Sequence, residues 1–336
     1  MFAVYVSNAD SGDLAVLRLD PARATLEPVQ RVEVGANLMP LALSPDRRFL
    51  YAAQRAEPWQ VASFAIDPAS GALARIGSAP LPHSMASIAT DRSGRYLLSA
   101  SYGGNLIAVS PIGADGIVQP AQQVVPTGPH AHAIQADPSN RHVFATVLGA
   151  GVLLQLRFDA ATGRLAPNTP AQMQPHDAAS PRHFAFGADA RFVYLLGELD
   201  AAIDVLAFDA QRGTLRTVQT VASLPAGFSG EPWAADLHLT PDGRFLYSSE
   251  RRSNTLAMFR VDTRDGTLAP LGHVATQAQP RGFNITPDGR FLIAAGQASH
   301  AVSLYAIDAQ SGALVPRGEC EVGRGPNWVE SLALRG

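Results

Sequence analysis

Several histidine, arginine and carboxylate side chains of this sequence are of the types needed for proton transfer and anion binding. Two short segments, Pro129-His-Ala-His132 and Pro181-Arg-His183, hold four of them, and Glu198 and Arg251 each follow an apolar run. Histidine and glutamate can accept and return a proton. The guanidinium fork of arginine pairs with carboxylate or phosphate. These types indicate acid–base chemistry on an anionic ligand, if the fold brings them together.

The composition excludes several other chemistries. All 26 basic residues are Arg, which excludes a Walker-type phosphate loop, a Schiff base and a lysine nucleophile. The formal net charge of −3 argues against a nucleic-acid partner. The single Cys320 excludes an intramolecular disulfide and a cysteine zinc cluster.

The pair His130 and His132 is the one pattern that suggests a metal. On a strand the two side chains point the same way, but no third ligand lies near them in the sequence. We therefore expect no metal and no cofactor.

An internal repeat predicts the elements that position these side chains. A turn followed by arginine and an apolar run recurs six times, with 46 to 53 residues between successive arginines: Arg48, Arg95, Arg141, Arg191, Arg244 and Arg290. We interpret these arginines as structural. A second motif, Asp, a short turn, Gly, any residue and Leu, recurs in step with the first, and with its degenerate copies it makes seven units.

Each unit contains four short apolar runs separated by turn residues. In the first full unit they are Leu38–Leu43, Phe49–Ala53, Val61–Ile66 and Leu73–Ser78. Four strands in every 46 to 53 residues predict an all-β fold, a seven-bladed β-propeller with four antiparallel strands per blade.

The two ends of the chain complement each other. Phe2–Val6 resembles a second strand without a first, and Trp328–Leu334 resembles a first strand without a blade. Pairing them would close the ring and remove an exposed sheet edge. We therefore expect one propeller domain over residues 1–336.

This topology predicts which segments share one face of the ring. The first strand of each blade lines the central channel, and the loop before it meets the loop between the second and third strands. The first kind of segment supplies His130, His132, Arg182, His183, Trp233, Arg281 and Trp328; the second supplies Arg55, Glu198, Glu250, Arg251 and Gln297. Glu198 and His132 are the candidates for proton transfer.

Longer strings resemble the seven-bladed propeller lactonases, a family that includes bacterial 6-phosphogluconolactonase and fungal carboxymuconate cycloisomerase. The resemblance covers the whole chain and is strongest in Gln279-Pro-Arg-Gly-Phe-Asn284, Leu292–Gln297, Trp233-Ala-Ala-Asp236 and Gly323–Trp328. The active residues proposed for the cycloisomerase branch, a His, two Arg and a Glu, match His132, Arg182, Arg251 and Glu198.

The resemblance implies hydrolysis of a six-membered aldonolactone by water. Glu198, aided by His132, would be the general base, and Arg182 would stabilise the oxyanion. Substrate binding would fall to Arg251, Arg281, His183, His130, Asn284, Trp328 and Gln297. Glu198→Gln is then expected to lower kcat strongly with little change in fold.

Three positions depart from the family pattern, Ser180, Gly197 and Glu250. A carboxylate of Glu250 that faced the pocket would weaken attraction for a dianionic phosphate. The expected substrate is therefore 6-phosphogluconolactone, with a non-phosphorylated galactaro- or glucarolactone as the alternative. A muconate cycloisomerase and a non-catalytic binding propeller remain further alternatives.

The sequence also predicts the partners and the compartment. It has no run of 18 apolar residues and no signal-like start, so we expect a cytoplasmic protein without a membrane partner. We expect a monomer whose partner is a small-molecule sugar lactone.

Overall fold

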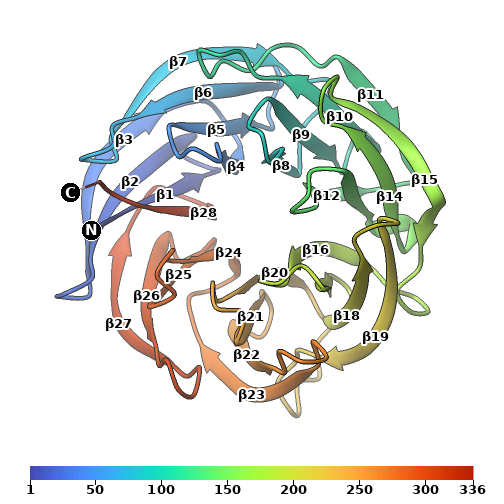
Figure 1. The fold of residues 1–336 in the computed structure, drawn as a ribbon. Helices are drawn as coiled ribbons and strands as arrows, with labels where there is room; N and C mark the ends of the chain where they lie inside the picture. Colours follow the sequence, from blue (N-terminus) through green and yellow to red (C-terminus); the bar gives the residue numbers. More distant parts are fainter. Residues whose placement is uncertain (336) are drawn as a thin grey trace.

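The computed structural model, described over residues 1–335, is a ring of seven four-stranded antiparallel sheets around a central channel (Figure 1). The predicted seven-bladed β-propeller is confirmed. The one helical element in this range is a single 3₁₀ turn, Leu148–Ala150. Across the same residues no helix has the length and apolar character needed to cross a membrane.

The strands of each blade are given from the channel outwards. They are β28 (Pro326–Ala333), β1 (Phe2–Asn8), β2 (Asp13–Asp20), β3 (Thr25–Glu33); β4 (Leu38–Leu43), β5 (Phe49–Gln54), β6 (Gln60–Ile66), β7 (Leu73–Pro80); β8 (Ser87–Thr90), β9 (Tyr96–Ser101), β10 (Leu106–Pro111), β11 (Gln123–Pro126); β12 (Ala131–Ala136), β13 (His142–Val147), β14 (Val152–Asp159), β15 (Arg164–Met173); β16 (Pro181–Phe186), β17 (Phe192–Gly197), β18 (Ala202–Asp209), β19 (Thr214–Ala222); β20 (Ala234–Leu239), β21 (Phe245–Glu250), β22 (Thr255–Val261), β23 (Leu268–Ala275); β24 (Pro280–Ile285), β25 (Phe291–Gly296), β26 (Ala301–Ile307) and β27 (Leu314–Glu321).

The ring closes as predicted, because β28 pairs antiparallel with β1 (Figure 1). The side-chain amide of Asn327 on β28 donates to the carbonyl oxygens of Ser7, at 3.2 Å, and of Leu38, at 3.1 Å. One buried side chain thus ties the last strand to its own blade and to the next one. No sheet edge is left exposed at the closure.

Five of the six recurring arginines tie their blade to the following one; Arg48 instead lies over the Phe49 ring, 5.1 Å from its centre. Arg141 Nη2 donates to the carbonyl oxygen of Ala210 at 2.8 Å, and Arg290 Nη2 donates to that of Pro21 at 2.9 Å. Three further arginines make the same contact with the third-to-fourth turn of the next blade: Arg95, Arg191 and Arg244. Their structural interpretation is confirmed by these contacts.

The glycine of the second motif is required by the same turn. At Gly312 φ is +76°, and the backbone N–H donates to the carbonyl oxygen of Asp308 at 2.8 Å. A Cβ atom there would lie 2.3 Å from Phe245 of the preceding blade. The motif therefore specifies both a left-handed turn and close contact between blades.

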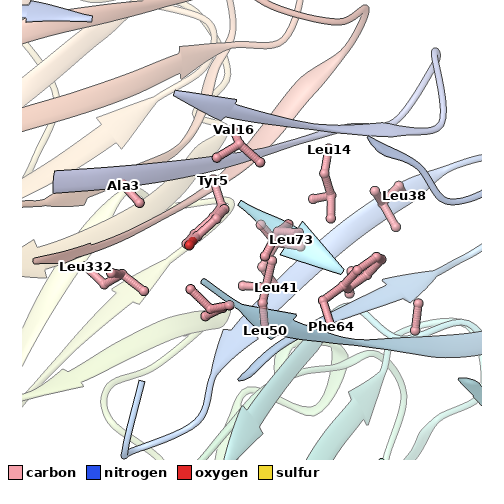
Figure 2. Close-up of a cluster of buried hydrophobic side chains, with 13 residues drawn as sticks. Ala3, Tyr5, Leu14, Val16, Leu38, Leu41, Leu50, Phe64, Leu73 and Leu332 are labelled. Atoms are coloured by element: carbon pink, nitrogen blue, oxygen red, sulfur yellow. The ribbon is translucent and has the colours of Figure 1, made fainter. Parts of the chain in front are cut away.

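The hydrophobic core lies between neighbouring sheets. Figure 2 shows the layer between the first two blades, where Tyr5 and Val16 face Leu41, Leu50 and other buried side chains. Each fully buried leucine contributes about 2 kcal/mol from removal of apolar surface from water. These layers hold the inner strands, and so the channel lining, in place.

Candidate active site

The candidate site begins on the fifth blade, where neighbouring strands place Arg182 and Glu198. Arg182 is the second residue of β16, and Glu198 follows the last residue of β17. The Glu198 N–H donates to the carbonyl oxygen of Ser180 at 2.8 Å, and the Ser180 hydroxyl accepts from the Leu199 N–H at 2.8 Å. Ser180, a departure from the family pattern, thus fixes the loop that carries the carboxylate.

The Glu198 carboxylate accepts three hydrogen bonds from side chains. Arg182 Nε lies 3.0 Å from Oε2, and Arg251 Nη2 and Trp233 Nε1 each lie 2.9 Å from Oε1. Burial alone would raise the pKa of Glu198, but the two guanidinium groups and these hydrogen bonds lower it below its ordinary value. Glu198 is therefore ionised and firmly held.

The two arginines that hold Glu198 are themselves almost fully bonded. Arg182 also donates from Nη1 to the carbonyl oxygen of Ala235, and Arg251 donates to those of Trp233 and Ala234, both at 3.0 Å. The Arg251 guanidinium lies 3.8 Å above the ring centre of Trp233. Of the nitrogens of these two guanidinium groups, Nη2 of Arg182 and Nη1 of Arg251 have no hydrogen-bond partner within residues 1–335. A ligand could therefore bind to these two nitrogens.

Arg281, the second residue of β24, lies close to this pair. Burial lowers its pKa well below the ordinary value, and the positive charges of Arg182, Arg251 and Arg55 lower it further. Arg55, which follows β5, has its pKa lowered by burial and by Arg182. Arg182 and Arg251 are thus bonded to Glu198, and Arg55 and Arg281 add two more guanidinium groups to the same end of the channel.

His132 is a neutral imidazole beside these arginines. It is the second residue of β12, and only 5% of it is exposed. Burial lowers its pKa well below 6.5, and the nearby charges of Arg182 and Arg281 lower it further. Its Nδ1 is buried without a hydrogen-bond partner among the described residues. At neutral pH His132 can therefore accept a proton.

His183 lies deeper in the channel than Arg182, one residue farther along β16. Its Nδ1 lies 2.7 Å from Asp236 Oδ1, and the other carboxylate oxygen of Asp236 lies 3.2 Å from His238 Nε2. Burial and Arg182 lower the pKa of His183 to about 4. For His238 the Asp236 charge outweighs burial and raises the pKa. His183 contacts the site through His132, whose ring centre is 5.1 Å away.

Trp328 also lies on the deeper side. Its Nε1 donates to Glu330 Oε1 at 3.2 Å, and burial raises the pKa of Glu330. His183, Asp236, Trp328 and Glu330 line a cavity of about 440 Å³ that includes none of the four clustered arginines. His183 and Trp328, which were predicted to bind substrate, thus line this cavity, and His183 joins it to the arginine cluster through its contact with His132.

Three predicted binding residues lie at the edges of the site. His130 stacks on Tyr102 with ring centres 4.0 Å apart, and it approaches His132 only through that ring. Asn284 accepts a hydrogen bond from Ser331 at 2.7 Å. Gln297 follows β25 and is half-buried.

The Glu250 carboxylate does not face the channel freely. Glu250 is 2% exposed and accepts hydrogen bonds from the backbone N–H groups of Trp233, Arg252 and Ser253, at 2.7, 3.1 and 2.5 Å. It fastens two loops together. Glu250 was expected to weaken phosphate binding only if its carboxylate faced the pocket, and the carboxylate is instead bonded to these backbone groups.

Sequence reasoning missed the Asp236, His238 and Glu330 group and the bond from Trp233 to Glu198. Asp236 and His238 alternate along β20 and so share a face, which was the available signal. Arg55 was placed on the correct face but not among the binding residues. Its signal was its position, since Arg55, Glu198 and Arg251 each follow the second strand of a blade.

Comparison with known proteins agrees with this geometry. The family described as "Lactonase, 7-bladed beta-propeller" matches residues 2–331. The chain is 42% identical to proteins named 6-phosphogluconolactonase from Pectobacterium carotovorum, over 331 residues, and Serratia proteamaculans, over 332 residues, covering 98% of each chain. It is also similar to the solved structure of the Pseudomonas aeruginosa periplasmic gluconolactonase PpgL, at 31% identity and a TM-score of 0.92 over 99% of each chain.

Proposed function

This chain belongs to the seven-bladed β-propeller lactonase family, and from that premise we propose its function. The protein hydrolyses the ester bond of a sugar lactone. The proposed substrate is 6-phosphogluconolactone, which the names of its relatives at 42% identity support. The observation that carries the proposal is a neutral His132 beside the guanidinium groups of Arg182, Arg251 and Arg281, the first two of which are bonded to Glu198. This arrangement suits an anionic substrate and a proton acceptor.

The reaction can be written on these side chains. His132 takes a proton from water while the water oxygen adds to the lactone carbonyl carbon. Arg182 Nη2 stabilises the oxyanion that forms, a role typically worth about 3 kcal/mol. The ring C–O bond then breaks, His132 returns the proton to the leaving oxygen, and the new carboxylic acid releases its own proton to solvent.

Glu198 takes a different part from the one expected from sequence. Both oxygens of the Glu198 carboxylate already accept hydrogen bonds from arginines, whereas Nδ1 of His132 has no hydrogen-bond partner among the described residues. We therefore assign proton transfer to His132. Glu198 holds Arg182 and Arg251 in the orientation that presents their free nitrogens.

A non-phosphorylated gluconolactone is the second candidate substrate. The similarity to the periplasmic gluconolactonase PpgL, at 31% identity, favours it. With the phosphorylated substrate we propose a cytoplasmic monomer. The similarity to PpgL would instead favour a periplasmic location together with the non-phosphorylated substrate.

A pH-stat assay tests the proposal. Fresh 6-phosphogluconolactone, gluconolactone and galactarolactone are supplied to the purified protein, and base uptake is compared with spontaneous hydrolysis. We expect enzymatic turnover that is fastest with 6-phosphogluconolactone. Rates equal to the spontaneous ones for all three lactones would refute the proposed function.

A further inference from the structure

Arg55 and Arg281 differ from the other two arginines of the site in having no anionic partner. Arg182 and Arg251 are each bonded to Glu198, at 3.0 and 2.9 Å. Within residues 1–335, neither Arg55 nor Arg281 has a carboxylate within the 4.0 Å of an ion pair. These two positive charges are thus not held in ion pairs within the described residues.

The Arg55 guanidinium is poorly satisfied as well as unpaired. Its Nε is buried without a hydrogen-bond partner, and its Nη1 lies 2.9 Å from Met39 Sδ. A thioether sulfur is a weak acceptor. Leaving the buried Nε of this half-buried side chain without an acceptor costs free energy, which hydrogen bonds to an anionic ligand would recover.

Repeat geometry puts both side chains in functional positions. Arg55 follows the second strand of its blade, as do Glu198 and Arg251, and Arg281 is the second residue of its inner strand, as are His132 and Arg182. The two guanidinium groups come from blades separated only by the closing blade, and they are close enough to repel each other. They are therefore presented to the same ligand as the reacting groups.

We propose that Arg55 and Arg281 form the subsite that binds the phosphate monoester of the substrate. This inference rests on the proposed lactonase function and adds to it the residues that select a phosphorylated lactone. A phosphate dianion carries the two negative charges that the two arginines lack, and its oxygens replace the sulfur contact of Arg55 with charge-assisted hydrogen bonds. Glu250 does not oppose it, since backbone N–H groups occupy its carboxylate.

The kinetic test compares Arg55→Gln with wild type on two lactones. For 6-phosphogluconolactone we expect kcat/KM to fall roughly 30-fold, mostly through KM, as loss of a charge-assisted contact implies. For gluconolactone we expect a change below about threefold, because no phosphate is present to lose the contact.

The control variant is Arg324→Gln. Arg324 is exposed, has no ion pair among the described residues, and lies in the loop before β28 on the same face of the ring. This variant also removes one positive charge, and it should leave kcat/KM unchanged for both lactones.

Binding gives a readout that does not depend on turnover. Calorimetric titration of the wild type with 6-phosphogluconate should show binding that Arg55→Gln weakens about tenfold or more. Gluconate should bind both proteins equally. The variant should keep or raise the wild-type Tm, because it removes a desolvated charge that is repelled by Arg182.

The outcomes separate the two proposals. If a folded Arg55→Gln loses equal activity on both lactones, or binds 6-phosphogluconate as wild type does, the subsite is wrong and the lactonase proposal stands. If wild type hydrolyses neither lactone but binds 6-phosphogluconate through Arg55, the lactonase proposal fails and the phosphate subsite stands.

Discussion

Replacing Glu198 by glutamine should destabilise the protein substantially, in addition to any effect on catalysis. Glu198 is the one carboxylate bonded to both Arg182 and Arg251, and its side chain is only 13% exposed. The amide keeps nearly the same shape but carries no charge. Two arginines that are each 2% exposed would then be left without a counter-ion.

The magnitude follows from the burial of this group. Removing one partner of a buried ion pair costs about 3–5 kcal/mol, because the remaining charge stays desolvated and unpaired. With an unfolding entropy of about 2.1 cal/mol/K per residue, a chain of 336 residues should lose about 4–7 °C in Tm. Sequence reasoning expected little change in fold; the structure predicts a folded but clearly less stable variant.

Calorimetry at neutral pH checks this, with Glu27→Gln as the matched control. Arg18 and Glu27 form a pair at the same 3.0 Å, but their side chains are 49% and 53% exposed. Such a pair contributes about 0–1 kcal/mol, so the control should lose at most about 1 °C. Equal losses in the two variants would refute the reasoning, because burial would then have no effect on the strength of the pair.

The pH dependence supplies a second check on the same carboxylate. The pKa of Glu198 is lower in the folded state than the value of about 4.5 in the unfolded chain. The stabilisation that ionised Glu198 gives the fold is therefore complete above the unfolded-state pKa and is lost as pH falls through the folded-state pKa. The Tm difference between wild type and Glu198→Gln should therefore be largest near neutral pH and shrink below about pH 4. A difference that stays constant into acid would contradict the ionised, bonded state of Glu198.

Two further predictions follow from buried groups elsewhere. Tyr247→Phe should cost about 1 kcal/mol in chemical denaturation, because its hydroxyl donates to the carbonyl oxygen of Gly312 in the next blade at 2.8 Å. Tyr51→Phe is its control and should be neutral or stabilising, since that buried hydroxyl has no partner among the described residues; equal costs would disprove the assignment. If His132 is the proton acceptor, kcat/KM measured between about pH 5 and pH 7.5 should stay level through pH 6.5 and fall only in more acidic solution. An acid limb centred at or above 6.5 would assign the base to another group.

The fold could be predicted from sequence because its determinants are local and repeated. The turn residues and short apolar runs recur from blade to blade. The two complementary ends of the chain predicted that Trp328–Leu334 completes the blade of Phe2–Val6, as β28 does. The topology also grouped His132, Arg182, Glu198, Arg251 and Arg281 correctly on one face. The contacts of His183 with Asp236 and of Trp328 with Glu330 could not be predicted, because they depend on how far along an inner strand each side chain lies once the strands are packed.

The pairing of charges could not be predicted either, because it depends on distances between blades. The general-base role of Glu198 was predicted from its residue type, its loop and the family resemblance, none of which shows its partners. In the structure Glu198 is the acceptor for two arginines, and Arg55 is the arginine without an acceptor. The chemical state of each group therefore follows from its neighbours in space rather than from its motif.

The two edges of each blade explain where function can reside in this fold. At one edge the first-to-second and third-to-fourth turns repeat closely, because an arginine of one blade must reach the turn of the next, as Arg141 reaches Ala210. At the other edge the N–H of the residue after the second strand donates to the residue before the first strand of the same blade, and its side chain varies from Arg55 to Glu198 to Arg251. Structural contacts between blades thus constrain one face of the ring and leave the other free to vary. Departures from the repeat on that variable face are therefore the best sequence signal for a binding residue in a propeller, and Arg55 is the departure that the lactonase motifs alone did not identify.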